Sequence, residues 1–208
     1  AAAVAGLLAA GAVFSCADTE KDMKSGKPPV VRKAMGAGRW FPAGRDKLAV
    51  MIDGFVDKAE IPKIDGRIVG AIAPHAGYQY SGGVAGFTFR AIKTNLAGTN
   101  APETVVVLGG SHRMAFKGVA IMDGDSIETP LGTNTLDKAA FEILARGRDR
   151  IHLDYAPHAG EHSAENEIPF VQRVLPDAKL VVAVTGDHDR ETLNQLVAAL
   201  NELAKAKK

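Results

Sequence analysis

Two runs of aliphatic residues, AKLVVAVTG (178–186) and ETVVVLGG (103–110), determine the fold class of this chain. Neither run alternates apolar with polar residues, and continuous Val and Leu runs of this kind are typical of buried strands in parallel sheets. Two shorter runs, GRIVGAIA (66–73) and GVAIM (118–122), predict further strands. Segments with the apolar spacing of helices alternate with these runs, at 46–58, 82–97, 136–147, 163–175 and 189–205. This alternation predicts an α/β fold with a mostly parallel, mixed sheet and helices on both faces.

The length and charge of the chain limit its domain count and its partners. Its 208 residues suffice for one α/β domain with a hydrophobic core. The 25 Lys and Arg residues nearly balance the 24 Asp and Glu residues, which leaves a net charge of +1. This balance gives no electrostatic reason to expect a nucleic-acid partner. We therefore expect one domain at 30–208 that binds a small molecule or a peptide, in an oligomeric state that the sequence does not reveal.

The N-terminal stretch AAAVAGLLAAGAVFS ends at Cys16, which is the only cysteine of the chain. This apolar stretch is too short for a stable membrane span but suits an export signal, and VFSC resembles a lipoprotein cleavage box. Without an initiator Met or a basic start, the signal would be clipped. We expect a signal-like segment at 1–16, lipidation of Cys16, a polar tether at 17–29, and an exported protein that is periplasmic or membrane-anchored. If residues 1–16 form an ordinary Ala-rich helix instead, the protein is cytoplasmic.

Histidines follow three of the four predicted strands. His75 comes after 66–73, His112 after 103–110 and His188 after 178–186. Ligand sites of open parallel sheets lie at the carboxyl ends of the strands, where residues distant in sequence meet. A neutral imidazole is the commonest metal ligand in proteins. The pattern therefore predicts a metal site, and two histidines with a carboxylate are the ligand set of non-haem iron enzymes and also of zinc hydrolases.

Other polar residues lie near these histidines in the sequence. Tyr78 and Tyr80 follow His75, and we expect them, with Ser111, to line a substrate pocket. The segment HAGEHS places Glu161 and His162 ahead of a predicted helix, where they act as ligand, orienting pair or proton shuttle, or merely cap the helix on the surface. The pentapeptide APHAG occurs at both 73–77 and 156–160, and we interpret this identity as coincidence. No G-x-S-x-G motif supports a serine hydrolase.

Five blocks of the sequence resemble one known family. The blocks VRKAMGAGRWFPAGRDKL, IAPHAGYQYSG, VVVLGGSH, ETPLG and EHSAENEIPF, in this order, resemble the Memo family, whose prokaryotic members are called AmmeMemoRadiSam system protein B. The resemblance extends from about residue 30 to the end of the chain. It implies a fold like that of the class III extradiol dioxygenases, with a metal in the crevice. It also implies that His75 and His112 are metal ligands and that Glu161, His162 and Ser163 line the pocket.

The chain departs from the family pattern in three places. Gly110 stands where the family has proline, and the sequence contains neither the family's S-S-D-x-x-H segment nor its Cys-Gly segment, which supplies a further ligand. We expect that the chain is a fragment with an incomplete site that leaves apolar surface uncovered. The alternative is a short variant in which His188 or Glu161 completes the coordination.

The leading functional hypothesis is a dioxygenase-like redox enzyme. In this hypothesis His75 and His112 bind iron or copper, Glu161 and His162 act as an acid–base or orienting pair, and the substrate is unknown. Export to an oxidising compartment would favour copper. One alternative is an adaptor that binds a ligand or peptide in the same pocket without turnover. A second alternative is a zinc-dependent hydrolase.

Overall fold

In the computed structural model, the aliphatic run at 178–186 forms β7 (Lys179–Thr185), and every residue after Lys179 is buried. Strand β7 lies inside a four-stranded sheet of order β2-β7-β3-β6. Its neighbours are parallel β2 (Thr104–Gly110) and antiparallel β3 (Val119–Ile121), and β6 (Ile151–Leu153) pairs in parallel with β3. The predicted strands at 103–110, 118–122 and 178–186 are thus confirmed, and the sheet is mixed.

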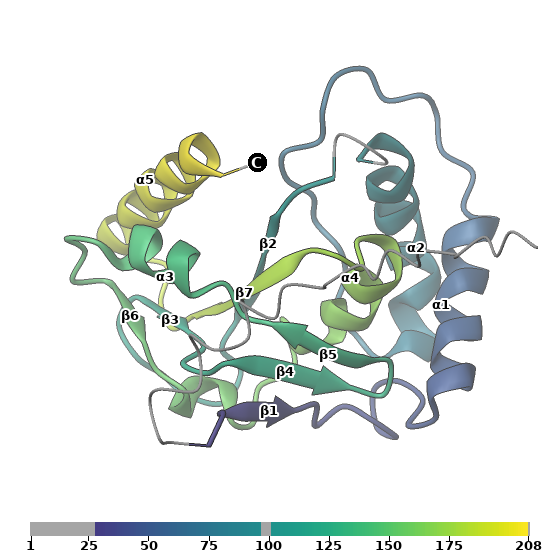
Figure 1. The fold of residues 1–208 in the computed structure, drawn as a ribbon, viewed down its shortest axis with the longest axis horizontal. Helices are drawn as coiled ribbons and strands as arrows, with labels where there is room; N and C mark the ends of the chain where they lie inside the picture. The colour runs from purple at the N-terminus through teal and green to yellow at the C-terminus, as the bar shows by residue number, and fades with distance from the viewer. Residues whose placement is uncertain (1–27, 97–100, 208) are drawn as a thin grey trace, which may run out of the picture.

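A second, smaller sheet lies beside the first one (Figure 1). It consists of β1 (Val31–Lys33), β4 (Ser126–Thr129) and β5 (Gly132–Thr135). Strand β1 pairs in parallel with β4, and β4 and β5 form an antiparallel hairpin. The sequence did not predict these strands because they are short and rich in polar residues. The α/β fold class is confirmed, with the strands divided between two sheets instead of one.

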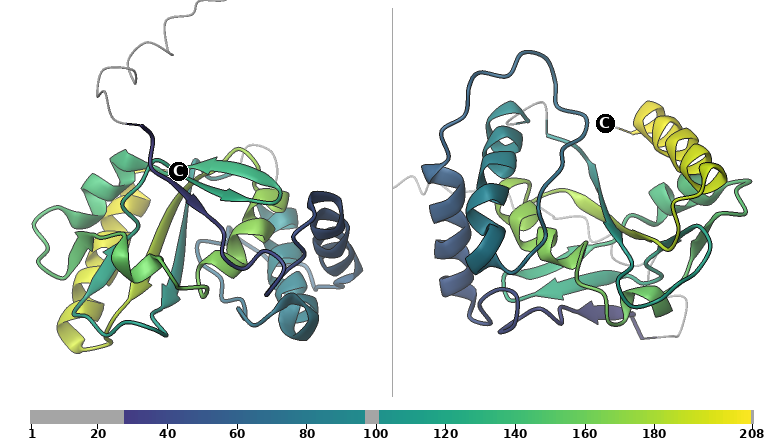
Figure 2. Two further views of the ribbon diagram at one scale, coloured as in Figure 1. Left: turned by 90° about the horizontal axis from the view of Figure 1, so that it is seen from below. Right: turned by 180° about the vertical axis from the view of Figure 1, so that it is seen from behind.

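Helices cover both sides of the four-stranded sheet (Figures 1 and 2). The helices α1 (Arg45–Lys58), α2 (Tyr78–Asn95) and α4 (Ile168–Val174) pack together on one side. On the other side, α3 (Lys138–Ala145) packs against α5 (Arg190–Ala206). All five predicted helices are present, but 163–175 is divided into a 3₁₀ turn, η4 (Glu165–Glu167), and α4. Pro169 explains this division, since proline fits only in the first turn of an α-helix.

The predicted strand at 66–73 is wrong. In the structure this segment is extended but pairs with no strand among the described residues, and Val69 and Ile72 are 92% and 94% exposed. Polar side chains of α2 hold it instead: Asn95 Oδ1 accepts from the backbone N–H of Ile68 at 2.7 Å, and Thr88 Oγ1 donates to Ile72 O at 2.9 Å. An apolar β-branched run becomes a strand only where a neighbouring strand accepts its hydrogen bonds. Here the hydrogen-bond partners of the run are side chains of the helix α2.

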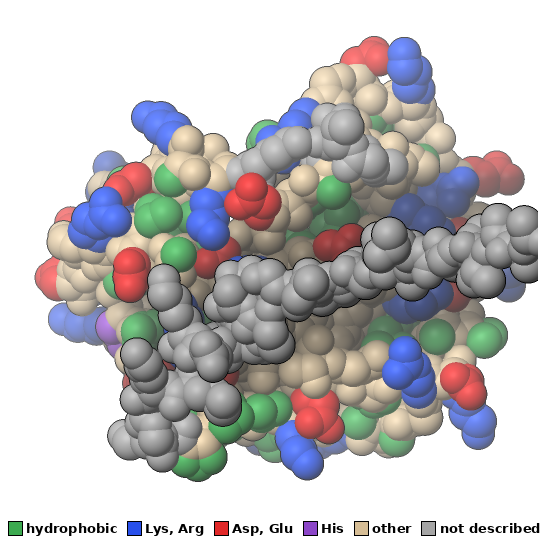
Figure 3. Space-filling model, in the orientation of Figure 1, with side chains coloured by type: hydrophobic (Ala, Val, Ile, Leu, Met, Phe, Trp, Pro, Cys, Tyr) green, Lys and Arg blue, Asp and Glu red, His purple; other side chains and the backbone are tan. Residues whose placement is uncertain are grey.

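The structure describes residues 28–96 and 101–207. The signal-like segment 1–16, its lipidation site Cys16 and nearly all of the tether 17–29 therefore lie outside the described residues and stay predictions. Within the described ranges, no helix combines the length and apolar character needed to cross a membrane. Basic and acidic side chains intermingle on the face shown in Figure 3.

The loop at 156–167 leads from β6 to α4 and carries Glu161 and His162, two of the polar residues singled out in the sequence. Arg32 of β1 is 4% exposed and donates to two carbonyls of this loop, His158 O and Glu161 O, at 2.9 to 3.1 Å. The same guanidinium forms an ion pair with Glu165, whose Oε1 also accepts from Gly36 N at 2.6 Å. A buried cation is stable only when all its donors are satisfied, and here the loop supplies the acceptors.

A second anchor of the loop is His158, in the short 3₁₀ helix η3 (Ala156–His158). Its ring is buried, and Nε2 lies 3.0 Å from the carbonyl oxygen of Ala120 in β3. Burial lowers the pKa of His158 to about 4, although the hydrogen bond to Ala120 acts in the opposite direction. The second APHAG copy thus carries a neutral structural histidine.

We predict that Arg32→Met destabilises the protein by about 3 to 5 kcal/mol, because it leaves the Glu165 carboxylate buried without a counter-charge. A matched control is Arg173→Met. Arg173 forms an equally close pair with Asp53 at 2.6 Å, but both side chains are about 40% exposed, so the expected cost is at most about 1 kcal/mol. Urea unfolding measures both values, and equal losses in the two variants would contradict the assigned role of Arg32.

We predict that the buried His158 makes the folded protein less stable at acid pH. Below pH 6.5 the unfolded chain protonates this histidine, whereas the folded chain does not until about pH 4. The free energy of unfolding should therefore fall by about 3 kcal/mol from this residue alone as the pH drops from 6.5 to 4. His158→Gln keeps a donor for Ala120 O but does not titrate, so its stability should fall less. Identical pH profiles of unfolding for both proteins would exclude this assignment.

Candidate metal centre

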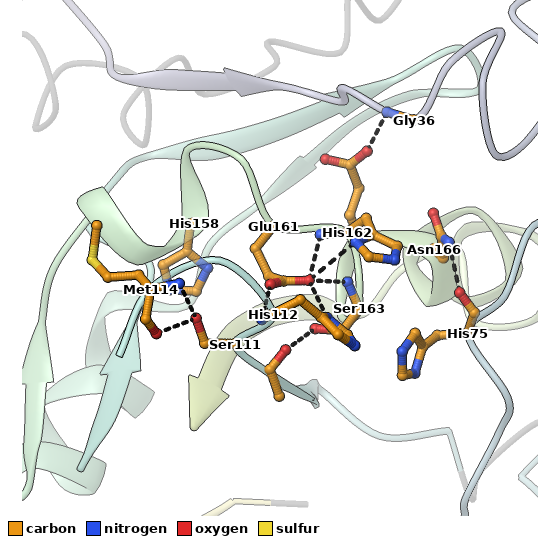
Figure 4. A network of polar contacts seen from close by, with 12 residues as sticks. Gly36, His75, Ser111, His112, Met114, His158, Glu161, His162, Ser163 and Asn166 are labelled. Carbon is orange, nitrogen blue, oxygen red and sulfur yellow. Dashed lines mark hydrogen bonds and ion pairs between the residues drawn. The ribbon is translucent and has the colours of Figure 1, made fainter. Parts of the chain in front are cut away.

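Three imidazoles from distant parts of the chain meet at one place. One ring nitrogen each of His75, His112 and His162 lies within 4.8 Å of the other two, and the described residues contain no other such group of His, Cys, Asp or Glu. The ring centroids are 4.9 to 5.9 Å apart. His75 precedes α2, His112 follows β2, and His162 lies in the loop 156–167 (Figure 4). The site is therefore assembled by tertiary contacts.

His112 is oriented by a carboxylate. Glu161 Oε2 accepts from the backbone N–H of His112 at 2.6 Å, and Glu161 Oε1 lies 2.9 Å from the Nδ1 atom of its ring. Strand β2 brings His112 to this position, since the histidine lies two positions after Gly110, the last residue of β2. With Nδ1 engaged, Nε2 is the nitrogen of His112 that stays available as a ligand.

The carboxylate of Glu161 also contacts His162, its neighbour in the loop 156–167. Its Oε1 accepts from the backbone N–H groups of His162 and Ser163 at 2.7 and 2.8 Å, and it lies 3.2 Å from His162 Nδ1. Burial raises the pKa of Glu161, but the hydrogen bonds from His112, Ser163 and His162 outweigh burial and lower the pKa to about 2. Glu161 is therefore a fixed negative charge that orients the ring of His112 and fixes the backbone of His162.

His75 is positioned through its backbone. Its carbonyl oxygen accepts from Asn166 Nδ2 at 2.8 Å, and the carbonyl oxygen of Asn166 accepts from the hydroxyl of Tyr78 at 2.7 Å. The backbone N–H of Tyr78 in turn donates to Trp40 O at 2.8 Å. These bonds fix the start of α2 against the loop 156–167. The geometry of His75 thus depends on hydrogen bonds made by its neighbours in α2 and in the loop 156–167.

The indole of Trp40 forms one wall of the site. It stacks on the ring of His162 with a centroid distance of 4.6 Å and an interplanar angle of 11°. The guanidinium carbon of Arg39 lies 5.2 Å from the Trp40 ring centroid. We predicted no role for Trp40 or Asn166 from the sequence, although both lie in blocks that carry the family resemblance.

Burial favours the neutral form of His75 and of His162. Burial lowers the pKa of His75, and the neighbouring His112 lowers it further while Glu161 opposes the shift. Burial also lowers the pKa of His162; Glu161 opposes this shift, and His112, His75 and Arg113 add to it. A neutral imidazole has a free lone pair, which is the form that binds a metal.

The other predicted site residues lie apart from the three rings. The side chain of Tyr78 is buried in the core between Phe41 and Phe170, whereas Tyr80 is 76% exposed. The hydroxyl of Ser111 donates to the carbonyl oxygen of Met114 at 2.7 Å. His188 is not a member of the imidazole group, and its Nε2 lies 3.2 Å from Thr185 Oγ1. His112 follows a strand, as predicted, whereas His75 follows no strand among the described residues.

Comparisons with known proteins agree with this architecture. A family model described as Memo-like protein matches residues 32–208. Among curated proteins, a MEMO1 family protein from Pyrobaculum aerophilum is 35% identical over 181 residues, which are 84% of this chain and 63% of the relative. MEMO1 family proteins from Nitrosopumilus maritimus and Thermotoga maritima are 31% and 34% identical, with 86% and 83% of this chain and 65% and 64% of each relative aligned.

The chain spans less than two thirds of the length of these relatives. The matched region nevertheless contains the three imidazoles, Glu161 and the anchoring Arg32. A family match over nearly all described residues, together with relatives more than 30% identical, shows that this chain belongs to the Memo family.

Proposed function

We propose that His75, His112 and His162 bind one divalent transition-metal ion and that the protein is a metal-dependent redox protein. The observation that supports this proposal is the convergence of three ring nitrogens within 4.8 Å, two of them on rings that contact the same buried carboxylate. Metal-binding histidines commonly donate their second ring nitrogen to a carboxylate, which fixes the ring and makes it a better ligand.

The residues of the site fit a metal ion. Burial keeps His75 and His162 neutral, so their protons do not compete with an ion. Glu161 lies next to the Nδ1 atom of His112, which leaves Nε2 of that ring for coordination, and Nδ1 of His162 has no hydrogen-bond partner among the described residues. Trp40 stacks on His162 and limits rotation of that ring. The site is also open to ligands, since the side chain of His112 is 47% exposed.

This arrangement assigns Glu161 and His162 different roles from the acid–base pair that the sequence suggested. Glu161 is a positioning residue, because its oxygens accept several hydrogen bonds and a pKa of about 2 keeps it ionised. His162 becomes the third ligand, in place of the predicted candidates His188 and Glu161. The bound ion would supply Lewis-acid or redox chemistry, and the protein's part is to hold three ligands and leave positions open.

Iron or copper is the metal we favour, and zinc is the alternative. Imidazoles suit all three metals, and three histidines with an open position also occur in catalytic zinc sites. A zinc-dependent hydrolase is therefore a second candidate function. The metal content of protein purified without added metal separates the two: iron or copper supports redox chemistry, whereas zinc supports hydrolysis. Oxygen uptake by the loaded protein then distinguishes turnover from ligand binding alone.

We predict that the protein binds one metal ion per chain and that His75→Ala, His112→Ala and His162→Ala each reduce the bound metal to a small fraction of this value. His188→Ala is the matched control, because His188 also follows a strand but lies outside the imidazole group. Elemental analysis after dialysis measures the metal, and circular dichroism confirms that the variants are folded. Stoichiometric metal in all three alanine variants would refute the proposed site.

Glu161→Gln tests the positioning role. The amide oxygen has no negative charge, so we expect metal affinity to fall by about 10- to 100-fold, the usual effect of losing a carboxylate that orients a metal ligand. Glu167→Gln is the control. Burial raises the pKa of Glu167 to about 8, so this nearby residue carries little charge at neutral pH and its substitution should change affinity by less than about twofold. Competition with a chromophoric chelator measures both affinities; an unchanged affinity in Glu161→Gln would argue against orientation by Glu161.

A further inference from the structure

The negative charge that contacts the imidazole group is buried. Glu161 is the one carboxylate that contacts these imidazoles among the residues that the structure describes, and its oxygens already accept hydrogen bonds from His112, His162 and Ser163. It is also 2% exposed, so it cannot present its charge to a ligand. A metal ion bound as proposed above would add further positive charge. The site therefore lacks an accessible anion of its own.

Arg113 directly follows the candidate ligand His112 and is exposed. Its aliphatic stem crosses the loop 156–167 at Gly160, where a Cβ atom would lie 3.3 Å from Arg113 Cδ and 4.0 Å from Nε. This close approach places the stem of Arg113 against the residue that precedes Glu161. The positive charge of Arg113 acts on His162.

The guanidinium of Arg113 has no hydrogen-bond or ion-pair partner within the described part of the chain. Other arginines of this protein form close ion pairs: Arg148 pairs with Glu202 at 2.8 Å, and Arg173 pairs with Asp53 at 2.6 Å. A second cation, Arg39, lies against the face of Trp40 and forms no ion pair in the described ranges. The guanidinium of Arg113 is thus unpaired within the described residues, whereas that of Arg39 contacts the indole of Trp40.

We propose that the ligand of this site is a small organic carboxylate and that Arg113 is the residue that selects it. This inference rests on the proposed metal site and names the class of its substrate. The planar guanidinium matches a carboxylate in a two-bond geometry, which lysine cannot reproduce. A carboxylate held by Arg113 lies over the imidazoles, beside the positions that the three ligands leave open. Arg113 is a specificity-determining residue and takes no part in proton transfer.

The test compares two probes of the same shape that differ in charge, benzoate and benzamide. Each is titrated into protein loaded with cobalt(II), and binding is followed by the visible spectrum of the metal and by calorimetry. We expect benzoate to bind roughly tenfold more tightly than benzamide, as one charge-assisted pair predicts. Arg113→Gln should remove this preference, and Arg113→Lys should retain only part of it. The control is Arg67→Gln, an exposed arginine in the extended segment 66–73, which should change nothing.

The outcomes separate this inference from the metal proposal. Equal affinity for benzoate and benzamide in the unaltered protein, or an unchanged preference in Arg113→Gln, would overturn the role of Arg113 while the measured cobalt content leaves the metal site intact. Failure of the unaltered protein to bind cobalt, read from the metal content before any probe is added, would overturn the metal site and this inference with it. A preference that disappears in Arg113→Gln, with cobalt content unchanged, supports both.

Discussion

The buried guanidinium of Arg32 is the interaction on which the candidate site depends. It lies on β1, yet it donates to the carbonyls of His158 and Glu161 and pairs with Glu165, residues about 126 to 133 positions later in the sequence. A buried cation requires fully satisfied donors, so the loop 156–167 can adopt few conformations without a large loss of stability. Through these contacts Arg32 fixes the position of the Glu161 backbone.

The orientation of the imidazoles follows from that fixed backbone. The carboxylate of Glu161 reaches from the loop 156–167 to His112 at the end of β2, and within its own loop it contacts His162. Asn166, four residues after His162, holds the carbonyl of His75. Three imidazoles are thus positioned by buried polar contacts before any ligand binds. Sites of this kind are precise because their supporting residues are themselves locked by packing.

Membership of the Memo family agrees with this architecture but does not by itself name a reaction. The proposed function depends on the donor set: three imidazoles, neutral where burial acts on them, and an ionised carboxylate behind two of them. The role proposed for Arg113 beside this set goes beyond what the motifs and the family match contain. The apolar side chains of Val69 and Ile72 are exposed next to α2.

Local patterns in the sequence determined the α/β class, the strands β2 and β7, the five helices, and the position of His112 after β2. Such features depend on residues within a few positions of one another, which is why periodicity and composition predict them. Only the tertiary structure decided that 66–73 is unpaired, that His162 and not His188 joins His75 and His112, and that Trp40 and Arg32 support the site. These outcomes depend on contacts between residues some 50 to 130 positions apart. No local pattern encodes such contacts, because burial and hydrogen-bond partners arise only when the segments pack together.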